Sequence, residues 1–267
     1  MTRSLDLMLA AVERDLGDRT KWFRPNGYSA PALAILDSIY STRNRYSGVK
    51  NALAKYRRAR EGDGADAWND GPKELIDAAQ RWAGPGGDPV EALVDRTNKW
   101  LVSSKAGAER KAAAALGAAK ILSAAGLETR GAVQAALTDP VQQETSPLKQ
   151  EWRSLPGQSS ALTWTYFLML NGIPGVKADR MVLRYVSAAT AEEVSAKDAA
   201  ALVREVATRI GESATVLDHA IWRHQSGRPV EQVMPDTVGP VTSETGALPA
   251  QASSGIEDTE EVIITDA

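Results

Sequence analysis

The 267-residue sequence contains no cysteine, two phenylalanines and two histidines. The lack of cysteine excludes disulfide bonds, thiolate zinc sites and cysteine-bound iron–sulfur clusters, and it suits a reducing compartment. His219 and His224 have no accompanying metal-ligand pattern, so neither a metal nor a cofactor is expected. No apolar run approaches the roughly 20 residues that span a bilayer, and the polar N-terminus is unlike a signal peptide. The sequence therefore predicts a soluble, cytoplasmic protein without a membrane partner.

The net charge of −3 hides an uneven distribution along the chain. Residues 229–267 contain eight of the 34 acidic residues and no Lys or Arg. Residues 1–228 thus carry 31 basic and 26 acidic side chains, a net charge of +5. A basic body fits a nucleic-acid partner, although many unrelated enzymes share this balance. The tail 229–267 has too few apolar residues to form a core and is predicted to be disordered.

Helix-favouring patterns dominate residues 1–228. The Ala-rich stretch KAAAALGAAKILSAAG (111–126) favours a helix, and alternating runs of β-branched residues are missing. We therefore predict an all-α fold, with an irregular connector over 138–152 and a loop over 61–72. Helices are expected over 3–16, 30–40, 48–60, 72–83, 89–101, 106–125, 130–137, 159–171, 179–188, 191–194, 197–210 and 212–225.

Two turns of similar composition, Leu155-Pro156-Gly157 and Ile173-Pro174-Gly175, lie close together in the sequence. Each is next to an expected helix, and the N–H groups of a helix N-terminus favour an anion such as a DNA phosphate. The second turn is followed by Asp179 in the pattern D-x-x-V-x-R. Either turn can therefore be the one that contacts a phosphate.

Three segments in a particular order, 33–56, 105–122 and 155–186, resemble the helix-hairpin-helix DNA glycosylase superfamily, the relatives of endonuclease III and the adenine DNA glycosylases. The resemblance covers about 30–225 and is most specific in the third segment. There, a hairpin that starts at Leu155 places Asp179 at the family spacing. A hairpin that starts at Ile173 would place the catalytic position at Lys197, without the Val of the family pattern. We therefore assign the hairpin to Leu155.

The resemblance implies a two-lobed all-α fold with the substrate cleft between the lobes. Residues 1–30 and 161–228 would form a terminal helical lobe, and 31–160 a central barrel of helices that ends in the hairpin. The partner would be double-stranded DNA with one base flipped out of the helix, and the protein would act as a monomer.

Asp179 is the residue to which the resemblance assigns catalysis. Cleavage of an N-glycosidic bond builds positive charge on the sugar, and a carboxylate can stabilise this charge and activate a water. An Asp before a helix is also a common N-cap. The nucleophilic Lys of bifunctional family members corresponds to Ala161 here, so the resemblance implies base release without an associated lyase activity.

DNA-binding candidates lie in three segments. They are Gly157, Gln158, Ser159 and Ser160 in the hairpin, Tyr40, Arg43, Asn44 and Arg45 in the loop that fills the gap left by the flipped base in the family, and Lys177 and Arg180 beside Asp179. The second glycine of the family hairpin is Ser159 here, which weakens the predicted phosphate contact. Trp22, Trp164 and Tyr166 are candidates for stacking on the base, although aromatic residues at helical spacing also indicate a core.

The function predicted on this basis is that of a monofunctional DNA glycosylase that excises a damaged or modified base, in DNA repair or in antiviral defence against modified foreign DNA. Two alternatives remain open. One is a DNA-binding module of the same fold without catalysis, and the other is a helical domain for protein–protein interaction.

Overall fold

A computed structural model describes residues 2–232, which fold as one unit. Within this range the chain forms α-helices and two short 3-10 helices but no β-strand, which confirms the all-α prediction. Of the tail predicted to be disordered, 229–267, the part from 233 onward lies outside the described residues. The prediction is wrong for Val230, Glu231 and Gln232, which form hydrogen bonds with residues 18–23. No helix among residues 2–232 is long and apolar enough to cross a membrane. The α-helices are α1 (Thr2–Leu16), α2 (Pro31–Tyr40), α3 (Tyr46–Gly62), α4 (Pro72–Ala83), α5 (Pro89–Arg96), α6 (Lys111–Ala124), α7 (Arg130–Leu137), α8 (Pro140–Thr145), α9 (Pro147–Ser154), α10 (Leu162–Leu170), α11 (Arg180–Thr190), α12 (Ala196–Ile210) and α13 (Ala214–Gln225).

Many of these helices begin at a local sequence signal. A side-chain oxygen at the N-cap satisfies a backbone N–H that has no partner within the helix. Proline suits the first helical position because its missing N–H would be unpaired there. The N-cap side chains that accept such a bond at α-helices are Asp88, Thr129, Asp139, Ser146, Asp179, Ser195 and Ser213.

The prediction of an irregular connector over 138–152 is wrong, because α8 and α9 occupy most of it. Asp139 and Ser146 cap these two helices, and each is followed by a proline. Trp152 of α9 is buried, with ring centroids 5.6 Å from Trp164 and 5.2 Å from Phe167. The polar composition of the segment hid two helix starts whose signals are present in the sequence.

The helix predicted at 191–194 is also wrong. Ala191 adopts a left-handed conformation with φ 56°, which ends α11. The chain then forms a turn until Ser195, whose side chain accepts a hydrogen bond from the backbone N–H of Asp198 at the start of α12.

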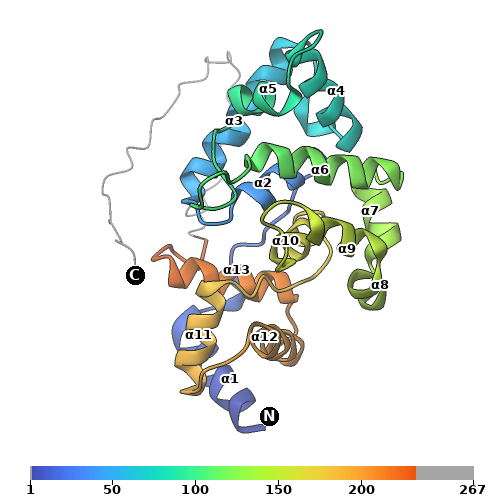
Figure 1. Cartoon of the computed structure of the whole chain (residues 1–267). Coiled ribbons are helices and arrows are strands. Elements are labelled where there is room, and N and C mark those ends of the chain that lie inside the picture. The colour runs from blue at the N-terminus through green and yellow to red at the C-terminus, as the bar shows by residue number, and fades with distance from the viewer. Residues whose placement is uncertain (1, 233–267) are drawn as a thin grey trace, which may run out of the picture. The chain divides into compact units, whose positions relative to one another are not determined.

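The buried residues form two hydrophobic clusters. The first contains residues of α2 to α7, α9 and α10, and the second contains residues of α1, α11, α12 and α13. Figure 1 shows α1, α11, α12 and α13 packed together. Trp164 and Phe167 of α10 belong to the first cluster, although 161–228 was expected in the terminal lobe. The change from one cluster to the other falls between Ile173 and Val176.

Helix α2 is buried along its whole length and contacts α3, α4, α6 and α10. The Ala-rich face of α6 allows this approach, since alanine side chains leave room for a neighbouring backbone. A fully buried helix is expected to be apolar, but α2 contains an acidic residue, Asp37, which is 1% exposed. A buried carboxyl group needs a compensating partner or a function.

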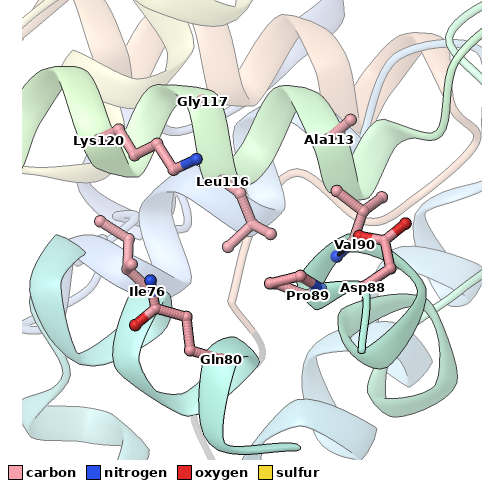
Figure 2. A pocket seen from close by; sticks show the side chains of 9 residues that line it. All are labelled: Ile76, Gln80, Asp88, Pro89, Val90, Ala113, Leu116, Gly117 and Lys120. Atoms are coloured by element: carbon pink, nitrogen blue, oxygen red, sulfur yellow. Dashed lines mark hydrogen bonds between the residues drawn. The ribbon is translucent and has the colours of Figure 1, made fainter. Parts of the chain in front are cut away.

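A pocket of about 250 Å³ lies between α4, α5 and α6 (Figure 2). Most of its walls are apolar. None of the residues predicted to act in a site lines it. The lining residues are Ile76, Gln80, Asp88, Pro89, Val90, Ala113, Leu116, Gly117 and Lys120.

Candidate active site

Asp179 lies at the end of the connector between α10 and α11 and caps the N-terminus of α11. Its Oδ1 accepts hydrogen bonds from the backbone N–H of Met181 at 2.8 Å and of Val182 at 3.4 Å. Both of these bonds are accepted by the same oxygen, Oδ1. The carboxylate is partly buried, and the helix N-terminus favours its negative charge. The N-cap role is therefore real, and it leaves one oxygen for a further partner.

Lys177 links the connector to two other segments. Its Nζ donates a hydrogen bond to Ser41 Oγ at 3.2 Å and lies 3.8 Å from the centre of the Tyr166 ring. Its backbone N–H donates to Asp218 Oδ1 at 2.9 Å. Ser41 directly follows α2 and Asp218 is part of α13. One residue thus joins segments that are 136 and 41 positions away in the sequence.

Three carboxylates, Asp37, Asp179 and Asp218, interact electrostatically with the Lys177 ammonium group. Burial lowers the pKa of Lys177, and all three carboxylates oppose this shift. We call Asp37, Tyr166, Lys177, Asp179 and Asp218 the junction cluster, since they come from elements of both hydrophobic clusters. Among residues 2–232, no group of three or more His, Cys, Asp or Glu residues could hold a metal ion.

Burial shifts the two deepest acids of the junction cluster in the same direction. It raises the pKa of Asp37 to about 6, against the opposing effects of Tyr28, Lys177 and Tyr46. It also raises the pKa of Asp218 well above its ordinary value, and the charge of Asp179 adds to that shift. Perturbed carboxyl groups that share charge partners are typical of functional sites, although structural ion pairs can also produce them.

The loop after α2 is held by two side chains. The buried Lys111 Nζ donates hydrogen bonds to the carbonyl oxygens of Tyr40, at 3.2 Å, and Thr42. The Asn44 amide donates to the same two oxygens at 2.9 and 3.3 Å. Arg43, between Thr42 and Asn44, has a φ of 59°. This left-handed backbone conformation costs a non-glycine residue about 1–2 kcal/mol. The loop therefore has a fixed shape that presents the exposed Arg43 side chain.

The loop candidates for filling the DNA gap differ in their environments. Tyr40 is fully buried, and its hydroxyl pairs with Thr97 Oγ1 at 2.8 Å. Its assignment to a DNA contact is corrected, because the ring belongs to the core. Asn44 is partly buried and caps the end of α2, whereas Arg43 and Arg45 are exposed.

The segment 155–161 forms the turn between α9 and α10. Gly157 has φ 73°, and a Cβ there would lie 2.7 Å from Val102, so this position requires glycine. Gln158 is 2% exposed, and its Oε1 accepts a hydrogen bond from Thr163 Oγ1 at 2.5 Å. The predicted DNA contact by Gln158 is therefore corrected. Gly157, Ser159 and Ser160 are exposed.

The aromatic candidates for the base pocket separate into two groups. Trp22 is buried, with Nε1 donating to the Leu16 carbonyl at 2.7 Å, and Trp164 is buried against Trp152. Both are core residues, which corrects their assignment to the base pocket. Tyr166 is partly buried and faces the Lys177 ammonium, and Arg180 is exposed beside Asp179.

Asp37 and Asp218 are site residues that the sequence reasoning missed. Asp37 lies in the apolar run LAILDSIY, and Asp218 lies in VLDHAI. The sequence signal for these two sites was a single acid within an apolar helical run, because acidic residues are almost never fully buried unless they are paired. The pattern alone does not show that both acids approach Lys177.

Lys111 gives the protein a testable pH dependence. Burial, with the positive charges of Arg43 and Lys177, lowers the pKa of Lys111 from 10.5 to about 7. Between these values the unfolded chain binds a proton that the folded protein does not, so the free energy of unfolding rises with pH. The slope from this group is at most about 1.4 kcal/mol per pH unit. We expect urea unfolding at pH 7–10 to show this rise in the wild type and its loss in Lys111→Met. Equal slopes in the two proteins would contradict the assignment.

Comparison with curated proteins and with solved structures found no match. One family model matches residues 6–226, which include the whole junction cluster. The description of that family is a domain of unknown function, DUF8548. Because the match covers most of the sequence, the chain belongs to this family.

Proposed function

We propose that this protein is a monofunctional DNA glycosylase of the helix-hairpin-helix type, with Asp179 as its catalytic carboxylate. The observation that carries the proposal is the hydrogen bond between Lys177 Nζ and Ser41 Oγ. It brings the Asp179 segment next to the loop at 41–45. A glycosylase needs these two parts together, because the loop must fill the space of the base that the carboxylate acts on.

The mechanism assigns separate tasks to the two Asp179 oxygens. Oδ1 remains bound to the N-terminus of α11, which fixes the carboxylate. Oδ2 faces the sugar of the extruded nucleotide, stabilises the positive charge that develops there and orients a water. The N-glycosidic bond breaks with its electron pair moving to the base. Water then bonds to the sugar carbon and transfers a proton to the carboxylate.

Two further features support a DNA partner. The turn 155–161 presents the exposed Gly157, Ser159 and Ser160 just before α10, where helix N–H groups favour a phosphate. The loop at 41–45 presents Arg43 and Arg45, which can pair with the backbone or enter the gap. We extend the proposal to a two-lobed fold in which the two hydrophobic clusters are the lobes.

Base release without strand cleavage follows from the position of the amines. Ala161, at the position of the lyase lysine, carries none. Lys177 Nζ is hydrogen-bonded to Ser41 and lies over the Tyr166 ring. An amine in these contacts is less available to attack the sugar.

The proposal is tested by incubating the protein with duplexes that each carry one modified base, and with bacterial and bacteriophage DNA. Mass spectrometry identifies the released bases, and alkali reveals abasic sites. We expect strand breaks only after alkali. Breaks without alkali would indicate a lyase. Salt-sensitive DNA binding without abasic product would favour the inactive DNA-binding module, and no binding at low salt would favour a protein-interaction domain.

A further inference from the structure

Asp37 carries a carboxylate oxygen without a partner. Its Oδ2 accepts a hydrogen bond from the Tyr28 hydroxyl at 2.8 Å. Its Oδ1 is buried and has no hydrogen-bond partner among the described residues. An unpaired buried acceptor costs free energy, so the fold retains this oxygen at the expense of stability. Residues kept in this way are candidates for binding a ligand.

The groups that interact with the Asp37 carboxylate are aromatic or cationic. Tyr28, Tyr46, Tyr166 and Lys177 all interact electrostatically with its carboxylate. The Tyr46 hydroxyl also approaches the Asp37 carboxylate as a hydrogen-bond donor and lowers its pKa, but its contact with Oδ1 does not reach hydrogen-bond geometry. All four of these residues are partly buried, whereas Asp37 is 1% exposed.

The chemistry of this environment limits the ligand. The carboxylates of Asp37 and Asp179 disfavour an anion, and the tyrosine rings favour a planar group. An ionised carboxylate only accepts hydrogen bonds, so the matching ligand must donate one. The Lys177 ammonium group, a charge partner of Asp37, contacts one hydroxyl and one ring.

We propose that Asp37 reads the edge of the extruded base by accepting an N–H hydrogen bond, so that the site prefers an amino-bearing base over its keto counterpart. A keto oxygen in the same place would face the carboxylate oxygen without a proton between them. This inference rests on the proposed function, since it names the class of base that Asp179 acts on. Lys177, two residues before Asp179, bonds to Ser41 Oγ at 3.2 Å, and the Ser41 backbone N–H donates to the Asp37 carbonyl at 2.9 Å. The two acids therefore lie around one lysine side chain, and one nucleotide that contacts both fits this arrangement.

Two pairs of bases differ mainly in this amino-to-keto exchange: 5-hydroxymethylcytosine with 5-hydroxymethyluracil, and adenine with hypoxanthine. Each base is placed in a duplex opposite an abasic-site analogue, on a 2′-fluoro sugar that resists cleavage. The full-length wild type should bind the amino member of at least one pair about tenfold more tightly, as one charge-assisted hydrogen bond permits. A ratio near one for both pairs would overturn the inference.

Asp37→Asn tests the residue itself, because the amide offers a donor to a keto oxygen. We expect the ratio to fall to one or to invert. Asp70→Asn is the matched control, since Asp70 is also a buried acid that accepts a hydrogen bond from a tyrosine hydroxyl, Tyr56, and it lies outside the junction cluster. This control should keep the wild-type ratio. Thermal unfolding checks that the variants fold, and Asp37→Ser serves if Asp37→Asn does not.

The outcomes separate this inference from the proposed function. A tenfold preference that Asp37→Asn removes supports base reading even if no base is released from natural sugars. Base release with an unchanged ratio in Asp37→Asn leaves the glycosylase in place and reduces Asp37 to a structural partner of Tyr28.

Discussion

Asp179→Asn is expected to lower the rate of base release by about a thousandfold or more, with the fold intact. The loss combines the contribution of a general base with that of charge stabilisation, each worth about 100-fold or more. Asparagine is as good an N-cap as aspartate. Its side-chain oxygen can therefore keep the hydrogen bonds to Met181 and Val182. Single-turnover release from the best substrate, beside urea unfolding, measures both properties.

The matched control is Asp88→Asn at the start of α5. Asp88 is also an N-cap, and its carboxylate accepts from the backbone N–H of Val90 at 2.8 Å. Asp88 is not part of the junction cluster, so Asp88→Asn should leave base release unchanged. Any effect of the Asp-to-Asn exchange on helix capping should be the same as in Asp179→Asn. If a folded Asp179→Asn variant released bases at the wild-type rate, Asp179 would be a helix cap and nothing more.

Arg60→Met should lower the free energy of unfolding by about 3–5 kcal/mol, because it leaves a buried charge without its partner. Arg60 Nε and Nη2 donate to the two oxygens of Asp70 at 2.7 and 2.9 Å. Both residues are at most 5% exposed. The Tyr56 hydroxyl donates to the same carboxylate at 2.6 Å. Urea unfolding of the single variant measures the loss.

The double variant Arg60→Met/Asp70→Leu separates the cost of the unpaired charge from the value of the ion pair. Replacing both partners of a buried ion pair by apolar residues is often neutral. We expect the double variant to be more stable than Arg60→Met. It should remain about 1–3 kcal/mol less stable than the wild type, because the Tyr56 hydroxyl loses its acceptor. A double variant that is less stable than Arg60→Met would show that the ion pair itself contributes the stability.

Local signals allowed the sequence to predict most of the helices. Proline and capping residues mark the starts at Pro72, Arg130 and Arg180, and these starts agree with the prediction to within one residue. The same signals at Asp139 and Ser146 were outweighed by polar composition, so α8 and α9 were missed. The N-cap at Asp179 was foreseen because only the residue type and its position before the helix are needed for it.

The sequence by itself determined an all-α protein and the place of Asp179 at a helix start, because helix propensity and capping act over a few residues. Only the tertiary structure decided that Tyr40, Trp22 and Trp164 are core residues, since helical spacing does not show which face is covered. The junction cluster is the strongest case. Its members come from α2, α10, the connector and α13, and the pairing of Lys177 with Ser41 depends on how distant helices pack. A buried charge such as Asp37 becomes interpretable only when its partners, and its unpaired oxygen, are known.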